Sequence, residues 1–185
     1  MSKRIPVAVR TVVLAVAMLA CVSSERATAQ EPPGTPVMSP APVPPALLNA
    51  RRVFISNAGA DSGLFPHPFN GDPDRGYSEF YAGMKSWGRY ELVSDPNDAD
   101  LVFELQLTAP NGPQNPSKQN GAADPLPMFR LVILERKSHY VLWALTESIE
   151  FAFLQKTHDH NFDQAVANLT ADLKRLTAVP VAASN

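Results

Sequence analysis

Residues 101–108 constrain the fold most strongly, because apolar and more polar side chains alternate there at every position. Leu101, Phe103, Leu105 and Leu107 stand two positions apart along the segment. Successive side chains of a β-strand point to opposite faces of a sheet, so this pattern is typical of a strand with one buried and one exposed face. The fold must therefore include a second layer that covers one side of a sheet.

Other apolar runs bounded by turn residues predict four further strands. The last two are expected to form a hairpin around residues 137–139. The four segments are 53–55, 90–93, 129–135 and 141–151.

Two other segments repeat apolar residues at helical spacing. The first is expected to begin at Asp72 and Pro73, as N-cap and first helical residue, and to end before Gly88. The second is expected to begin at Asn161, because Asn161 and Gln164 resemble a capping box. Two amphipathic helices can cover one face of a five-stranded sheet but not both.

The sequence therefore predicts an α+β fold, a two-layer sandwich of a mixed five-stranded sheet with two helices on one face, in the order β-α-β-β-β-β-α. The first strand, helix and second strand should form a crossover between parallel strands. We expect a single domain over residues 50–179, with long loops at 58–72 and 110–127. The uncovered sheet face is expected to carry the polar side chains of Glu104, Gln106, Thr146, Ser148 and Glu150.

Residues 1–29 have the pattern of a cleavable export signal. Basic residues precede an uncharged, mostly apolar run at 11–22, which is shorter than the roughly 20 residues of a membrane-spanning helix. An Ala-Thr-Ala sequence then predicts cleavage between Ala29 and Gln30. The cleaved protein is expected to be periplasmic or secreted.

A second interpretation of the N-terminus concerns Cys21. The sequence Met-Leu-Ala-Cys that ends there loosely resembles a lipobox, and lipidation at Cys21 would instead give a protein anchored to the outer membrane. Residues 30–49 hold seven prolines and no aromatic residue, which predicts an extended linker. Residues 180–185 are expected to form a flexible tail.

The charge balance and cysteine content exclude several classes of function. The full chain has a formal net charge of −2, and four of its basic residues but one acidic residue lie in the export signal, so the remainder is more acidic. Nucleic-acid binding usually requires a strongly basic face, so no nucleic-acid partner is expected. Cleavage after Ala29 would also remove Cys21, the single cysteine, and with it any disulfide or thiol nucleophile.

Several segments together resemble a family of small exported bacterial proteins of uncharacterised function. More distantly, the order of elements is similar to periplasmic domains of the anticodon-binding-like type, as in the TolB amino-terminal domain, curli-secretion lipoproteins and lipoproteins of unknown function. This resemblance, over residues 51–177, implies a non-catalytic role in the envelope and transfers no catalytic residue. The segments that carry it are 80–93, 98–102, 131–135, 141–143 and 161–165.

The most metal-like sequence is His158-Asp159-His160, since two imidazoles and a carboxylate can hold zinc or copper. The alternative is a solvent-exposed connector that precedes the last helix, and the sequence favours this alternative.

Asn70, Asp72 and Asp74 have the composition of a calcium loop. However, Tyr81 stands at the twelfth position, where such a loop needs a bidentate Glu. Asp72 is better explained as a helix cap.

Two acidic groups are also explained structurally. In the group Asp95, Asp98 and Asp100, the first is expected to cap a short turn and the last to start a strand. Glu147 and Glu150 stand three apart in a predicted strand, so they would point to opposite faces and could not act as a carboxylate pair.

No G-x-S-x-G, P-loop or H-E-x-x-H motif is present in the sequence. The sequence therefore predicts no catalytic, cofactor-binding or metal-binding residue. The expected function is that of a non-catalytic binding or adaptor domain for an unidentified envelope protein. The alternative is a metal- or small-ligand-binding protein that uses loops 58–72 and 110–127 together with His158 and His160.

Overall fold

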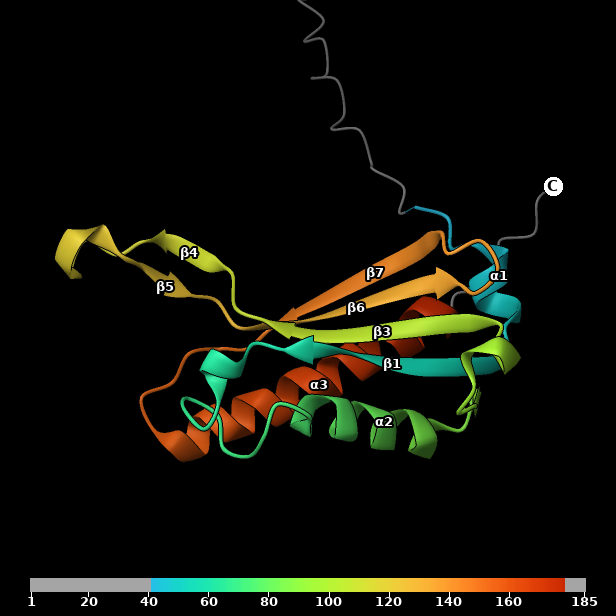
Figure 1. Cartoon of the computed structure of the whole chain (residues 1–185), viewed down its shortest axis with the longest axis horizontal. Coiled ribbons are helices and arrows are strands. Elements are labelled where there is room, and N and C mark those ends of the chain that lie inside the picture. Colours follow the sequence, from blue (N-terminus) through green and yellow to red (C-terminus); the bar gives the residue numbers. More distant parts are fainter. Residues whose placement is uncertain (1–40, 179–185) are drawn as a thin grey trace, which may run out of the picture. The chain divides into compact units, whose positions relative to one another are not determined.

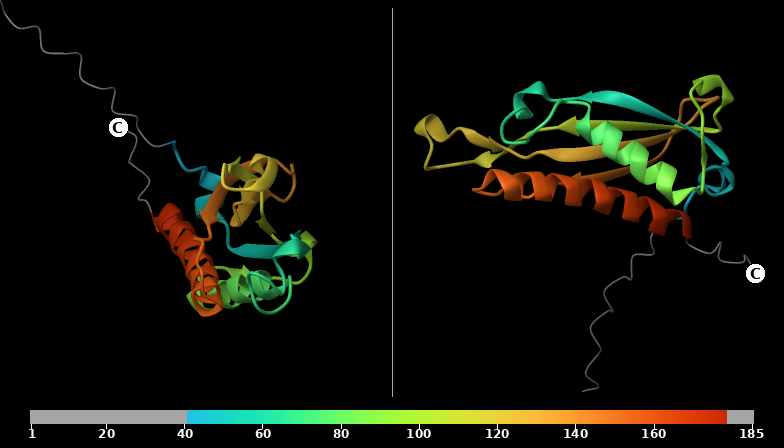
Figure 2. Two further views of the ribbon diagram at one scale, coloured as in Figure 1. Left: turned by 90° about the vertical axis from the view of Figure 1, so that its left-hand side faces the viewer. Right: turned by 90° about the horizontal axis from the view of Figure 1, so that it is seen from below.

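The computed structural model describes residues 41–178, which contain a five-stranded sheet in the order β2-β1-β3-β6-β7. Helices α2 (Arg75–Trp87) and α3 (Gln155–Ala178) lie against one face of this sheet (Figures 1 and 2). The predicted α+β two-layer sandwich is confirmed. The strands are β1 (Arg52–Ala60), β2 (Glu91–Leu92), β3 (Leu101–Thr108), β6 (Met128–Glu135) and β7 (Val141–Ser148).

The sheet contains both parallel and antiparallel strand pairs. Strand β1 pairs in parallel with β2 on one side and with β3 on the other, whereas β3, β6 and β7 pair antiparallel. The β1–α2–β2 segment is thus the expected crossover between parallel strands, and β6 and β7 form the expected hairpin.

The burial of residues 101–108 in the structure follows the alternation seen in the sequence. Leu101, Phe103, Leu105 and Leu107 are buried, and the residues between them are half-buried. Register aligns Leu105 with Leu131 and Leu145 across three strands, so each strand contributes apolar side chains to the same face. The helices cover this face with buried side chains of Phe80, Met84, Phe162, Ala165, Val166, Leu169 and Leu173.

The opposite face of the sheet carries polar side chains, as expected. Gln106, Arg130 and Thr146 align across β3, β6 and β7. Glu104 lies two residues earlier in β3, and Ser148 two residues further along β7. Glu150 does not belong to this face, because β7 ends at Ser148 rather than at residue 151.

Helix α2 begins later than the sequence indicates. Its first residue is Arg75 and its N-cap is Asp74, while the carboxylate of Asp72 accepts the Asp74 backbone N–H at 2.9 Å. Asp72 and Pro73 therefore form a turn that leads into the helix. The predicted C-terminal glycine is confirmed, since Gly88 has a φ of 68°, in the left-handed region that favours glycine.

Helix α3 begins at Gln155, six residues before the predicted start at Asn161. Residues 155–160 are almost entirely polar and show no helical periodicity, so the sequence pattern starts only at Phe162. Asn161 is not a cap: its side chain donates a hydrogen bond to the backbone carbonyl of Glu150 at 3.0 Å.

The packed part of the chain begins earlier than residue 50. Within the segment 30–49, which the sequence assigns to a linker, the short helix α1 (Pro45–Asn49) places Leu47 fully in the core. Arg89 fastens this helix by donating to the Leu48 carbonyl at 3.0 Å. The predicted signal 1–29 with Cys21, the cleavage site at Ala29 and Gln30, residues 30–40 and the tail 180–185 lie outside the described residues.

The predicted loop 110–127 contains a second, two-stranded sheet of β4 (Asn111–Gln114) and β5 (Ala123–Pro125). Prolines and glycines in this segment interrupt the alternation of apolar and polar residues that predicts a strand, so the sequence pattern does not reveal the hairpin. Gly112 permits the close approach of the strands, because a Cβ there would lie 2.8 Å from the Asp124 carbonyl oxygen. Within residues 41–178, no helix has the length and apolar character needed to cross a membrane.

Candidate functional site

A groove of about 510 Å³ lies at the end of the sheet from which the β4–β5 hairpin projects. Three segments form it: the loop at 63–69, the hairpin with its exit at 124–127, and the connection between β7 and α3. The predicted loops 58–72 and 110–127 and the side chain of His158 therefore come together, whereas His160, which the small-ligand hypothesis also uses, is exposed and does not line the groove.

Buried apolar side chains form the floor of the groove. Leu64 is the last residue of the 3-10 helix η1 (Ser62–Leu64), which Asp61 caps by accepting the Gly63 N–H at 2.9 Å. Phe69 is almost fully buried, and its ring lies 5.1 Å from that of Phe162 in α3. The floor is thus continuous with the core of the domain.

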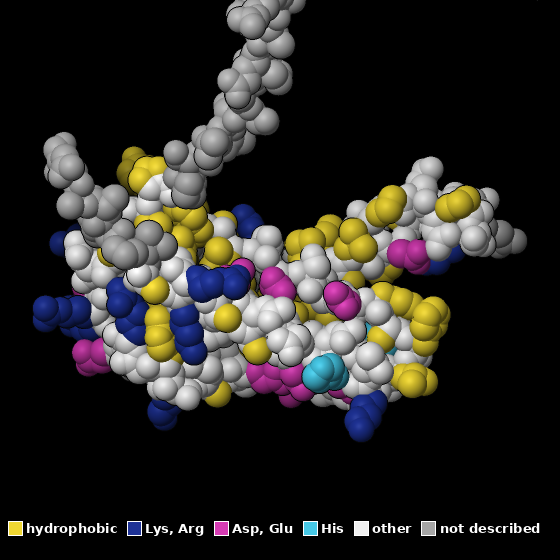
Figure 3. Space-filling model, turned by 180° about the vertical axis from the view of Figure 1, so that it is seen from behind, with side chains coloured by type: hydrophobic (Ala, Val, Ile, Leu, Met, Phe, Trp, Pro, Cys, Tyr) yellow, Lys and Arg dark blue, Asp and Glu magenta, His cyan; other side chains and the backbone are white. Residues whose placement is uncertain are grey.

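Large hydrophobic side chains around the groove are exposed to solvent. Phe153 is 94% exposed, Phe151 77%, Leu154 70% and Leu126 46%. Figure 3 shows hydrophobic side chains gathered at this end of the molecule. Contiguous exposed apolar groups with polar neighbours mark interaction sites, whereas isolated ones are common on any surface.

His158 lies between the floor and the exposed side chains. Its ring is 6.1 Å from Phe69 and 5.4 Å from Phe151, with an edge-to-face arrangement in both pairs. Phe151 and Phe153 form a further edge-to-face pair at 5.3 Å. The aromatic side chains therefore extend without a break from the core to the surface.

Asp159 fastens the loop that carries Phe69 to the first turns of α3. Its carboxylate accepts the backbone N–H of Asn70 at 2.9 Å and the Asn70 side-chain amide at 2.6 Å. Arg75 donates to the same carboxylate at 3.0 Å. Gln155, one turn earlier in α3, donates to the Pro68 carbonyl at 2.6 Å.

Arg75 joins this loop to both helices. Its guanidinium pairs with Glu79 at 2.8 Å, contacts Asp163 and lies over the ring of Phe162. Burial lowers the pKa of Arg75, but hydrogen bonds with Glu79 and Asp159 outweigh this effect and raise it. Desolvation likewise opposes the ionisation of Asp159, yet its hydrogen bonds with Asn70 and Arg75 leave its pKa below the ordinary value.

The hairpin side of the groove is held by a second carboxylate. Asp124 contacts the ammonium of Lys118 and accepts the Asn115 side-chain amide at 2.7 Å, and these two hydrogen bonds lower the pKa of Asp124. Glu150 also lines the groove, and the ion pairs found among residues 41–178 do not include it.

The structure separates the members of the His158-Asp159-His160 sequence. They lie in α3 rather than in a connector before it, and residues two apart on a helix do not face the same side. His158 faces the groove and Asp159 binds Asn70 and Arg75. Within residues 41–178, no three His, Cys, Asp or Glu side chains are placed to hold a metal ion.

The calcium-like residues also have separate partners. Asp74 accepts the side-chain amide of Asn57 at 2.7 Å, Asp72 closes a turn, and Asn70 binds Asp159. The three side chains thus serve the local structure rather than one shared ion.

The other acidic residues mostly have the structural roles expected. Asp95 caps the 3-10 helix η2 (Pro96–Asp98) by accepting the Asn97 N–H at 2.8 Å, and Asp100 precedes β3. Glu147 lies in β7 and accepts the Asn168 side-chain amide at 2.8 Å. Glu150 lies beyond β7, so the pair is not two residues of one strand.

Sequence reasoning missed the exposure of Phe151, Phe153 and Leu154. The sequence prediction places Phe151 at the end of a strand over 141–151 and assigns no structure to residues 152–154, because alternating aromatic residues fit a half-buried strand equally well. One available signal was length, since residues 141–151 would form a strand of eleven residues where five or six are typical.

No protein-family model matches the chain, and no curated protein matches it. Among solved structures, a PelC dodecamer from Paraburkholderia phytofirmans is similar with a TM-score of 0.43 and 11% identity, covering 70% of this chain and 89% of that one. A DUF330 protein from Xanthomonas campestris has a TM-score of 0.43 and 13% identity, covering 67% and 81%. Lipoprotein GNA1162 from Neisseria meningitidis has a TM-score of 0.37 and 14% identity, covering 66% and 99%.

These neighbours include the kinds of protein named by the sequence resemblance, namely lipoproteins and a family of unknown function. At such identities and TM-scores, no site residue or role passes from them to this chain.

Proposed function

We propose that this protein is an exported, non-catalytic binding protein of the bacterial cell envelope. In this proposal the groove holds an apolar segment of another envelope protein, and that segment also carries a Lys or Arg residue. The export signal expected at residues 1–29 supports the location. The observation that carries the binding role is the exposure of Phe151, Phe153 and Leu154 beside a preformed groove.

The extent of the exposed surface favours a protein segment over a small ligand. A compound seated in the groove would contact Phe69, His158 and Phe151, which line it or its floor. It would leave Phe153 and Leu154 in water, because these side chains lie outside the groove lining. A longer occupant can cover both the groove and the exposed side chains.

Each large side chain that passes from water into such an interface contributes about 1.5–3 kcal/mol. A partner that covers this region could bury four exposed side chains, those of Phe151, Phe153, Leu154 and Leu126. Aromatic residues surrounded by a polar rim are the usual centres of binding energy at interfaces.

The charge of the groove favours a basic partner. Its ionised side chains include the carboxylates of Asp124 and Glu150, and Lys118 neutralises only the first. A cation from the partner could pair with Glu150 without displacing any ion pair within the described part of the chain. A negatively charged group of the partner beside Glu150 would instead oppose binding.

The test is a selection of displayed random peptides on the full chain, compared with the Phe153→Ser variant. The proposal predicts that the wild-type protein enriches apolar peptides with Lys or Arg, and that Phe153→Ser abolishes this enrichment. Tyr140→Ser is the matched control, since Tyr140 is a large side chain that is 74% exposed in the β6–β7 turn, away from the groove.

Enrichment that survives Phe153→Ser, or that Tyr140→Ser abolishes equally, would contradict the proposed site. Enrichment of acidic peptides would contradict the proposed partner chemistry. A protein that enriches no peptide but binds a small apolar compound in the groove would overturn the proposal in favour of a small-ligand function.

A further inference from the structure

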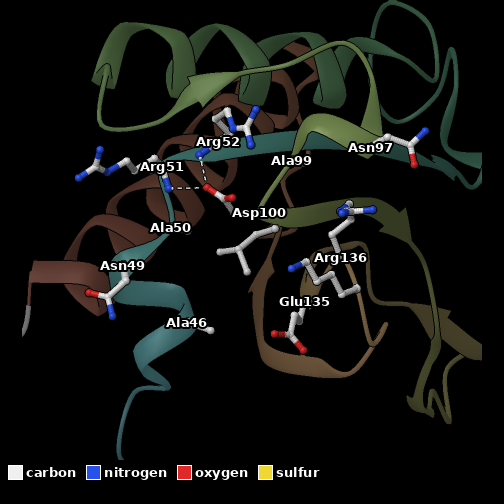
Figure 4. A pocket seen from close by; sticks show the side chains of 12 residues that line it. Ala46, Asn49, Ala50, Arg51, Arg52, Asn97, Ala99, Asp100, Glu135 and Arg136 are labelled. Carbon is white, nitrogen blue, oxygen red and sulfur yellow. Dashed lines mark hydrogen bonds between the residues drawn. The ribbon is translucent and has the colours of Figure 1, made fainter.

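A second hollow, of about 650 Å³, lies at the opposite end of the sheet from the groove. It is framed by α1, by the starts of β1 and β3, and by the end of β6. Figure 4 shows Arg51 and Arg52 on the β1 side of this hollow and Glu135 and Arg136 across from them, with Asp100 between the two sides.

The hollow is rich in positive charge. Arg51, Arg52, Arg136 and Lys137 line it, against the carboxylates of Asp100 and Glu135. None of these four cations takes part in the ion pairs found within residues 41–178. The lining therefore has a formal excess of two positive charges.

Both carboxylates already have hydrogen-bond donors of their own. Asp100 accepts the backbone N–H groups of Arg52 and Arg51, each at 2.9 Å, and these bonds hold its pKa below the ordinary value. Glu135 accepts the hydroxyl of Ser138. Asp100 thus positions the backbone from which the two arginine side chains project, rather than pairing with a guanidinium.

Arg136 has an unused donor. Its Nε atom is buried and has no hydrogen-bond partner among the described residues. A buried donor without a partner costs about as much free energy as a lost hydrogen bond, so buried donors are nearly always satisfied in native proteins. An acceptor bound in the hollow would satisfy it.

We propose that this hollow binds a phosphate group, with Arg52, Arg136 and Lys137 as its principal contacts. Guanidinium groups recognise phosphate oxygens through paired hydrogen bonds, and lysine adds a compact charge. A phosphate monoester carries about −1.5 to −2 charges at neutral pH and the phosphodiester of a lipid headgroup carries a single negative charge, so the excess positive charge of the lining attracts both. The side-chain amides of Asn49 and Asn97, also in the lining, supply further donors without charge.

A phosphate group reaches this site either free in solution, as on a phosphorylated metabolite, or as the headgroup of an anionic lipid. The test measures binding of inorganic phosphate to the full chain by calorimetry, and binding to vesicles of phosphatidylglycerol or phosphatidylcholine by co-sedimentation. The variants are Arg136→Gln, Arg52→Gln and the control Arg130→Gln. Arg130 is an exposed cation in β6, the strand that ends just before Arg136, and it lies on the sheet face away from the helices.

The proposal predicts that inorganic phosphate binds and that Arg136→Gln and Arg52→Gln each weaken its binding about tenfold or more, while Arg130→Gln changes it less than about twofold. Recruitment to phosphatidylglycerol vesicles with the same dependence on these variants would identify a lipid headgroup as the source. Phosphate binding without recruitment would identify a phosphate in solution.

Absence of phosphate binding at about 10 mM, or equal losses in all three variants, would overturn the proposal. Thermal unfolding of each variant checks that the fold is retained, and Lys137→Gln, at an exposed turn position, repeats the test without changing a buried side chain. None of these measurements involves the groove. Failure of the phosphate proposal would therefore leave the proposed binding function of the groove untouched, and the reverse also holds.

Discussion

The carboxylate of Asp159 accepts both the backbone N–H and the side-chain amide of Asn70, at 2.9 and 2.6 Å. These two hydrogen bonds join α3 to a loop that lies 89 residues earlier in the chain. Because that loop carries Phe69, the floor of the groove is fixed before any ligand arrives. A groove formed in advance spares a partner the entropy cost of ordering it.

Loss of this link should destabilise the fold. We expect Asp159→Ala to lower the free energy of unfolding by about 1–3 kcal/mol, since it removes the Asn70 and Arg75 hydrogen bonds together. Urea denaturation measures the change. Asp172→Ala is the control, because the ion pair of Asp172 is with the largely exposed Arg175, and it should change stability by less than about 0.5 kcal/mol. Equal effects in the two variants would contradict the role assigned to Asp159.

The same carboxylate should give the protein an acid-sensitive component of stability. Hydrogen bonding lowers the folded-state pKa of Asp159 and of Asp100 below 3.8. A lowered pKa stabilises the fold fully above the unfolded-state pKa, and this contribution is lost as the pH falls through the folded-state value. We expect the free energy of unfolding to decrease below about pH 4 and to decrease less steeply in Asp159→Asn, as followed by urea denaturation at several pH values.

Two glycines of α2 should respond oppositely to the same substitution. A Cβ at Gly76 would lie 2.6 Å from Cε1 of Phe129, so Gly76→Ala should cost about 1–3 kcal/mol. At Gly83 the nearest atom outside the helix would be Thr170 Oγ1 at 3.5 Å, an ordinary contact. Gly83→Ala should therefore be neutral or stabilise by up to about 1 kcal/mol. Thermal unfolding distinguishes the two, and a stabilising Gly76→Ala would refute the close packing of α2 against β6.

Phenylalanines in and beside the groove should separate into structural and binding residues. Phe69→Ala should lower stability by about 3–5 kcal/mol, because the ring is buried against Phe162. Phe153→Ser should change it by less than about 0.5 kcal/mol, since that ring is 94% exposed. Denaturation of both variants tests this, and a strongly destabilised Phe153→Ser would show that the ring is structural.

The sequence was sufficient to predict the layers of this fold where side-chain periodicity was strong. Residues 101–108 and the aromatic positions of α2 report burial directly, because the period of each pattern differs between strand and helix. It was insufficient where polar residues form regular structure, as in the first turns of α3, or where prolines occupy short strands, as in β4 and β5. In these segments tertiary contacts, such as Asp159 with Asn70, determine the structure.

Only part of the candidate site could be predicted from the sequence. The two long loops and His158 could be proposed as neighbours, and they do meet in one groove. The exposure of Phe151 and Phe153 could not be predicted, because an aromatic side chain at alternate positions is equally compatible with a core. It depends on the end of β7 at Ser148, which no local residue pattern marks.

The affinity of a defined peptide for the groove tests the proposed binding role. A labelled apolar peptide with one Lys, taken from the peptide selection, is titrated with the full chain by fluorescence anisotropy, beside a version with Glu in place of Lys. We expect Phe153→Ser to raise the Kd of the Lys peptide about tenfold or more, Tyr140→Ser to leave it unchanged, and the Glu peptide to bind more weakly than the Lys peptide. Equal affinities for wild type and Phe153→Ser, or for the two peptides, would contradict the proposed role.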